Sequence, residues 1–150
     1  MPNPINYILN RFHNSSHTRF LIEAFILSTA FPLSRFCARF LTDSITFSVT
    51  TERLLYVLAI APWFETIVCF VPVIEILRRF KVKPWIYTLI VSVLFAIPHS
   101  SFILGFYLGI VFAIVYIVAR QNSFLHAVLY CTCVHFIYNL LIVTLYSIAS

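Results

Sequence analysis

The sequence predicts an all-α integral membrane protein, a bundle of about four to five transmembrane helices with a polar site inside the membrane. Its 150 residues are 61% hydrophobic and only 10% charged, and the mean hydropathy is +0.97. About a quarter of the residues of a soluble domain are charged, so this chain has too little polar surface for a soluble fold. The apolar residues also gather into long runs, which makes one membrane-embedded domain the expected organisation.

Five apolar stretches follow one another along the chain, at residues 20–36, 54–77, 84–99, 102–119 and 124–148. The first is the least regular, because it contains Glu23 and is interrupted by Pro32. The second exceeds the length of about 20 residues that a helix needs to span a bilayer. Residues 98–101, at the junction of the third and fourth stretches, supply almost the only polar groups between them. This predicts a tight helical hairpin whose tip does not fully leave the membrane. We therefore expect a polar tail, an irregular first helix with a connecting segment, and a membrane core, at residues 1–19, 20–53 and 54–150.

Basic residues set the expected orientation, because cytoplasmic loops of membrane proteins are enriched in Lys and Arg. Four of them crowd the link between the second and third stretches: Arg78, Arg79, Lys81 and Lys83. This link is expected on the cytoplasmic side, and Arg120 brings the chain back to that side. The arginines before residue 54 leave the topology there open. Arg11 and Arg19 agree with a cytoplasmic N-terminus if the first stretch spans the membrane, whereas three others disagree: Arg35, Arg39 and Arg53. The net charge of +5 is thus explained by orientation, and no nucleic-acid partner is expected.

Four polar residues stand inside the later stretches, where lipid makes such groups costly unless they serve a site: Glu65, His99, His135 and Asn139. We measured the depth of three of them along their helices from the basic side, at a rise of 1.5 Å per residue. The depth is about 20 Å for Glu65, about 24 Å for His99 and about 22 Å for His135. Polar groups on three helices thus reach one level. This agreement predicts a single intramembrane site.

These residue types suit the hydrolysis of an amide. A carboxylate and a neutral imidazole, here Glu65 and His99, can share a water and take its proton as it attacks a carbonyl carbon. The second imidazole and the carboxamide lie four residues apart on one helix face, so His135 and Asn139 present donors suited to an oxyanion. Two other chemistries fit part of the set. Zinc accepts carboxylate and imidazole ligands, and intramembrane Glu and His also suit a proton or ion pathway.

The residues around these four resemble the motifs of the CPBP family, the CAAX-protease and bacteriocin-processing group of intramembrane glutamic endopeptidases. Its motifs are Glu-Glu-x-x-x-Arg, often preceded by Ala-Pro-x-x, then Phe-x-x-x-His and His-x-x-x-Asn. The chain matches them in order at Ala61–Glu65, Phe95–His99 and His135–Asn139, and the resemblance covers residues 61–147.

The resemblance implies a role for each matched residue and a setting for the protein. Glu65 and His99 would activate water, and His135 and Asn139 would bind the oxyanion, with no metal or other cofactor. The implied partner is a membrane-associated peptide or protein substrate within the lipid bilayer. The implied location is a bacterial inner membrane, and the oligomeric state stays open.

The first motif is incomplete. Thr66 stands where the family has its second glutamate, and Phe70 stands where it has arginine. Glu75 and Arg79 mimic part of the motif but lie too near His99, and we interpret them as an i, i+4 ion pair at a helix end. The departures keep open an alternative, a non-catalytic CPBP-like membrane protein that acts in bacteriocin self-immunity or as a scaffold.

Two further patterns concern packing. The cysteines lack the spacing of a metal finger, so we expect buried, reduced thiols: Cys37, Cys69, Cys131 and Cys133. The only two glycines, Gly105 and Gly109, form Gly-x-x-x-Gly, a spacing that lets helices approach closely in lipid. We expect this motif to pack helices within the chain rather than to form a dimer interface.

Overall fold

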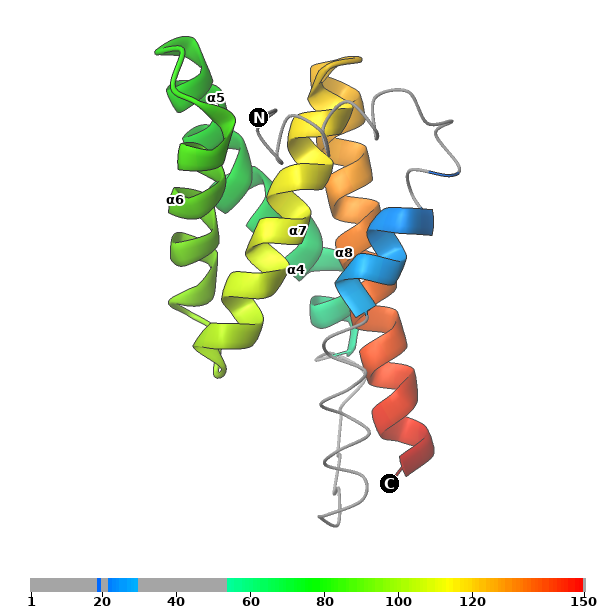
Figure 1. Ribbon diagram of the computed structural model, residues 1–150. Coiled ribbons are helices and arrows are strands. Elements are labelled where there is room, and N and C mark those ends of the chain that lie inside the picture. The colour runs from blue at the N-terminus through cyan, green and yellow to red at the C-terminus, as the bar shows by residue number, and fades with distance from the viewer. Residues whose placement is uncertain (1–18, 20–21, 30–53, 150) are drawn as a thin grey trace.

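The computed structural model describes residues 19, 22–29 and 54–149, and all regular structure within these residues is helical (Figure 1). The first long helix, Tyr56–Arg79, consists of four consecutive parts: η1 (Tyr56–Ile60), α4 (Ala61–Glu65), η2 (Thr66–Phe70) and α5 (Val71–Arg79). It is followed by α6 (Pro84–Ala96), α7 (Phe102–Arg120) and α8 (Phe124–Ala149). In the described part of the chain, three segments are long and apolar enough to cross a membrane, namely Tyr56–Arg79, Phe102–Arg120 and Phe124–Leu145, and α6 is a shorter apolar helix. The predicted helical membrane fold is confirmed.

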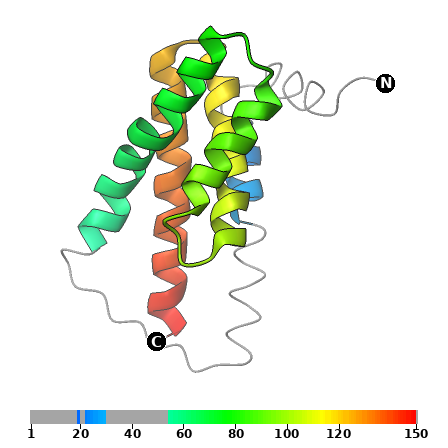
Figure 2. The ribbon, with the colours of Figure 1, turned by 90° about the vertical axis from the view of Figure 1, so that its left-hand side faces the viewer.

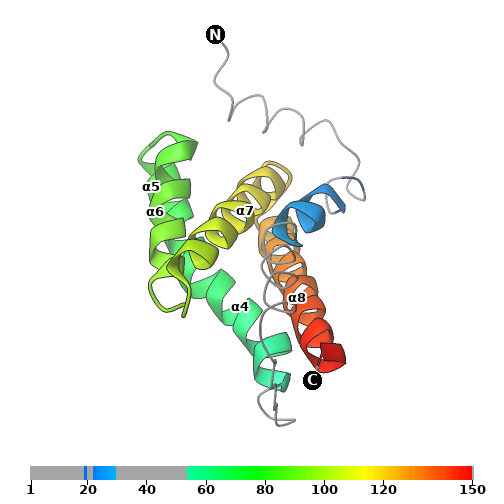
Figure 3. The ribbon, with the colours of Figure 1, turned by 60° about the horizontal axis from the view of Figure 1, so that its bottom comes forward.

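Helix α7 forms the centre of the bundle. It lies between α6 and α8 (Figure 3), and most of its residues are buried, whereas only a minority of the residues of Tyr56–Arg79 and α8 are buried. The exposed residues are large and apolar, as a lipid-facing surface requires, for example Phe64, Ile67 and Leu140. The core is therefore a narrow seam of apolar side chains along α7.

The turns confirm the expected hairpin and place the basic residues together. Helices α6 and α7 are joined by the short turn at residues 97–101. The turn after α5 and the turn after α7 both lie at the opposite end of the bundle, and α8 extends well beyond the α6–α7 turn (Figure 2). The cations of the α5–α6 link and Arg120 thus share one end of the molecule, as the charge pattern predicted.

A Schellman motif ends α5. The backbone N–H of Lys81 donates to the carbonyl of Arg78, and the N–H of Val82 donates to the carbonyl of Leu77. Lys81 itself has a left-handed backbone with a φ of 55°, a conformation that the motif usually assigns to glycine. The sharp reversal directs the chain straight into α6.

The two glycines bring α6 and α7 into close contact, as expected. A Cβ atom on Gly109 would stand 2.7 Å from the Cα of Ser92, and one on Gly105 would stand 2.9 Å from the Cα of Ala96. Each distance is shorter than a carbon–carbon contact, so only hydrogen fits there. The Gly-x-x-x-Gly motif therefore packs the hairpin within the chain.

Two π-helical turns flank the part of the first helix that carries Glu65. In both, a proline follows the turn by two residues: Pro62 follows η1 and Pro72 follows η2. Proline lacks an N–H group and its ring crowds the carbonyl four residues earlier. The wider turn bonds across five residues instead, from Ala61 N–H to the Tyr56 carbonyl and from Val71 N–H to the Thr66 carbonyl. Such turns are frequent at functional sites.

Part of the first apolar stretch is described. Residues 22–29 are helical, Ala24 belongs to the buried core, and the Tyr107 hydroxyl donates to the Leu27 carbonyl. The expected polar tail before Arg19 and the connecting segment 30–53 lie outside the described residues. Pro32 and Cys37 lie there, and so do four of the five arginines that left the topology open, Arg11, Arg35, Arg39 and Arg53. The other three cysteines, Cys69, Cys131 and Cys133, are free thiols, as expected, but only Cys131 is buried: Cys133 is exposed because it faces away from the bundle, and Cys69 is half-buried.

The expected ion pair between Glu75 and Arg79 is wrong. The carboxylate of Glu75 instead contacts Arg78 at 3.1 Å and Arg120 at 2.7 Å, and it accepts a hydrogen bond of 3.1 Å from the Tyr116 hydroxyl. Arg120 comes from α7, so the ion pair ties two helices together rather than stabilising one helix end.

Candidate active site

Glu65 and His135 meet between the first helix and α8. Glu65 ends α4, and its Oε2 lies 3.5 Å from Nε2 of His135. The Glu65 side chain is 27% exposed, whereas that of His135 is only 5% exposed. Oε2 of Glu65 and Nδ1 of His135 are buried and have no hydrogen-bond partner among the described residues. Buried polar atoms are usually satisfied, so these two retain the capacity to bond a reactant.

Aromatic rings hold the imidazole of His135. The ring of Phe112 stacks on it at a centroid distance of 4.5 Å, and the ring of Phe95 meets it edge-on at 5.8 Å. Phe70 extends the cluster, at 5.3 Å from Phe95 and 6.2 Å from Phe112. Rings from α6 and α7 thus pack directly against the imidazole, and Phe70 of the first helix supports both of them.

His99 lies in the turn that follows α6. Its Nδ1 is 2.6 Å from the carbonyl oxygen of Phe95, and its ring lies on that of Phe95 with centroids 4.4 Å apart. A carbonyl only accepts hydrogen bonds, so Nδ1 is the donor, and a neutral imidazole then carries its lone pair on Nε2. In the neutral imidazole, Nε2 is then the ring atom that can accept a proton.

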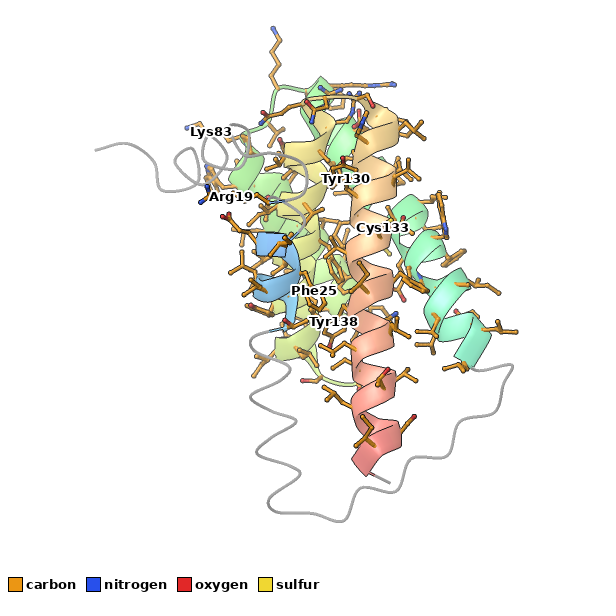
Figure 4. The ribbon with its side chains drawn as sticks, turned by 90° about the vertical axis from the view of Figure 1, so that its right-hand side faces the viewer. Arg19, Phe25, Lys83, Tyr130, Cys133 and Tyr138 are labelled. Atoms are coloured by element: carbon orange, nitrogen blue, oxygen red, sulfur yellow. The ribbon has the colours of Figure 1, made fainter. Side chains whose placement is uncertain are left out.

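One cavity of about 120 Å³ connects the two histidines with Asn139. It is lined by residues of α6, α7, α8 and the turn between α6 and α7: Phe95, His99, Ser100, Ser101, Leu104, Gly105, Leu108, His135, Tyr138 and Asn139. Tyr138 lies lower along α8 than Tyr130 and Cys133 (Figure 4). Glu65 does not line this cavity, but its carboxylate contacts His135, which does.

Asn139 links α8 to the helix that carries Glu65. Its Nδ2 donates to the carbonyl of Val57 at 2.9 Å. In an α-helix that carbonyl would accept from Ala61, but the N–H of Ala61 bonds Tyr56 instead, and the next residue, Pro62, has no N–H. Asn139 thus satisfies a carbonyl that the π-helical turn leaves without a helical partner.

The two residues that depart from the first motif are packing residues. Thr66 and Phe70 are fully buried. The Thr66 hydroxyl lies 3.7 Å from the Cys131 thiol on α8, and Phe70 belongs to the aromatic cluster. Neutral contacts therefore hold this face of the helix to the bundle.

The structure brings three of the four predicted residues around one cavity and the fourth, Glu65, against His135. The sequence predicted that Glu65 acts together with His99. This pairing remains a prediction, because in the structure Glu65 contacts His135. Phe112 was not singled out from the sequence, since one of 16 phenylalanines carries no signal by itself. Among the described residues, no three His, Cys, Asp or Glu side chains are grouped so that they could hold a metal ion.

Comparison with known protein families identifies the family of the chain. A family model described as type II CAAX prenyl endopeptidase Rce1-like matches residues 47–141, which contain all four candidate residues. No curated protein matches the chain, and no solved structure matches it.

Proposed function

The chain belongs to the type II CAAX prenyl endopeptidase Rce1-like family, and we propose that it hydrolyses a peptide bond of a membrane-associated peptide or protein. The family is one of proteases, and the apolar helices make the chain an integral membrane protein. The observation that carries the proposal is the contact of 3.5 Å between Glu65 and His135 at membrane depth, beside a cavity that His99 and Asn139 also line.

Each residue has a distinct role in the proposed reaction. A water held between Glu65 and His99 gives up a proton to this pair as its oxygen bonds to the scissile carbonyl carbon. The negative charge that develops on the carbonyl oxygen is stabilised by donors from His135 and Asn139. The C–N bond then breaks, and the leaving amine takes the proton. The free Nε2 lone pair of His99 supports its role as a base.

Substitution of Glu65 tests this mechanism. The nearly isosteric change Glu65→Gln removes the proton acceptor, so we expect cleavage of a quenched-fluorescent peptide pool by the detergent-purified protein to fall by about 10²–10⁴-fold. His135→Ala should lose cleavage as well, and a strong zinc chelator should leave the parent rate unchanged. Unchanged cleavage by Glu65→Gln would remove the glutamate from the mechanism, and loss with the chelator would assign the reaction to a metal.

A second candidate function is supported by Thr66 and Phe70. These buried neutral residues replace an acidic and a basic position of the first motif, as expected of a non-catalytic member that acts in bacteriocin self-immunity or as a scaffold. Such a protein would keep its biological effect in the Glu65→Gln variant, whereas a protease would lose it. In either case the proposed location is a bacterial inner membrane.

A further inference from the structure

A second pocket lies at the basic end of the bundle, away from the candidate active site, and we propose that it binds the phosphate of an anionic phospholipid headgroup. The pocket has a volume of about 180 Å³ and lies between α5, α6 and α7. Its lining combines two arginines, two neutral polar residues and an apolar floor: Arg78, Arg120, Tyr87, Gln121, Ile74, Ile117 and Pro84. Figure 4 shows Lys83 at this end and Tyr138 of the active-site cavity farther along the molecule.

The two arginines are held in place by hydrogen bonds, yet each keeps N–H donors for a ligand. Both contact the carboxylate of Glu75, which also accepts from the Tyr116 hydroxyl. A guanidinium has five N–H donors, so Arg78 and Arg120 retain donors after these bonds. The side chains of Arg78 and Arg120 are 47% and 23% exposed, so an anion can reach them. Because Glu75 fixes both, little ordering is left for a ligand to impose.

The charge around the pocket favours an anion. The surrounding turns and helix ends carry five cations against the single carboxylate of Glu75: Arg78, Arg79, Lys81, Lys83 and Arg120. Arginine presents a planar fork of donors that matches phosphate oxygens. The Tyr87 and Gln121 side chains add neutral hydrogen-bonding groups in the same lining.

The position of the pocket identifies the source of the phosphate as lipid. It lies where the spans Tyr56–Arg79 and Phe102–Arg120 end, which is the level of lipid headgroups. Phe80 and Trp85 are 77% and 39% exposed beside it, and aromatic residues are typical of the membrane interface. Basic pockets between transmembrane helices bind anionic headgroups. A lipid could fill this pocket while its acyl chains stay against exposed apolar residues such as Ile76.

The test compares two neighbouring arginines that carry the same charge. Arg78 lines the pocket and Arg79 does not. We would titrate the full chain, purified in a nonionic detergent, with phosphatidylglycerol and follow bound lipid by native mass spectrometry. Arg78→Gln should weaken the apparent Kd about tenfold, which corresponds to about 1.4 kcal/mol. Arg79→Gln should change it by less than about twofold, because exposed charges away from the site contribute little.

Three controls separate the pocket from its alternatives. Tyr87→Phe keeps the charge and should also weaken binding if the pocket itself is occupied, and thermal midpoints without lipid will show that each variant is folded. Phosphatidylcholine with the same chains, and glycerol phosphate without chains, should both bind more weakly than phosphatidylglycerol. Equal weakening by Arg78→Gln and Arg79→Gln would overturn the proposal in favour of general surface charge. Equal binding of phosphatidylcholine, or of glycerol phosphate, would overturn the preference for an anionic lipid.

Discussion

The contact between Glu65 and His135 is supported by aromatic residues to which the proposed reaction assigns no role. Phe112 stacks on the His135 ring, and Phe95 makes an edge-to-face contact with it. Aromatic pairs of this kind contribute about 0.5–1.5 kcal/mol beyond their burial. Phe70 fills the same cluster in the place of a motif arginine. The chain therefore orients its buried histidine by ring packing.

Asn139 should contribute to stability as well as to chemistry. Asn139→Ala leaves the Val57 carbonyl without its donor in an apolar setting, which costs about 1–3 kcal/mol. We expect a lower midpoint of thermal unfolding in detergent. Thr144→Ala is the matched control, because the Thr144 hydroxyl donates to a carbonyl of its own helix and is exposed. Equal midpoints for the two variants would show that the link between α8 and η1 stabilises nothing.

At this scale the sequence brought the candidate residues to one level of the bundle, but it did not predict which of them are in contact. The spacing of Glu65, His99 and His135 from basic residues gives their depth, but it does not give the rotation of each helix about its axis. The π-helical turns before Pro62 and Pro72 change that rotation for the first helix. The predicted partner of Glu75 was wrong for a related reason, because Arg120 reaches it from another helix.

The individual helices follow their sequence signals closely. The stretch predicted at residues 84–99 begins at Pro84 and keeps helical structure to Ala96, and the stretch at 102–119 forms α7. Proline at the start of α6 and the charged or polar residues between runs set these limits. The π-helical turns were not predicted, since a proline in an apolar run also fits a simple kink.

The close packing of α6 on α7 should depend on Gly109. Gly109→Ala places a methyl group 2.7 Å from the Ser92 backbone, which cannot move as a side chain can. Overpacking of this kind costs about 1–3 kcal/mol, so the thermal midpoint should fall. Ile103→Ala is a suitable control, because Ile103 is 68% exposed on the same helix. If Gly109→Ala unfolds at the parent temperature, the helices are not in the close contact described.

The whole molecule places two polar regions at two levels of one membrane bundle. The turns after α5 and α7 lie together at the basic end, whereas the candidate active site lies near the α6–α7 turn. The sequence predicted this arrangement because apolar length fixes the number of helices and basic residues mark their common end. The segment 30–53, where the sequence left the topology open, lies outside the described residues.

The central claim is that Glu65, in the pair that activates water, and His135, as a donor to the oxyanion, act in the same reaction step, and a double-mutant cycle on cleavage rate tests it most directly. Residues that act together in catalysis are strongly non-additive. Glu65→Gln and His135→Gln should each reduce the rate to nearly the same residual level, and the double variant should lose little more. Glu65→Gln combined with Glu75→Gln is the control, and its two effects should multiply because Glu75 lies in the other polar region. Multiplying effects for Glu65 and His135, or a parent protein that cleaves no membrane-associated peptide, would contradict the claim.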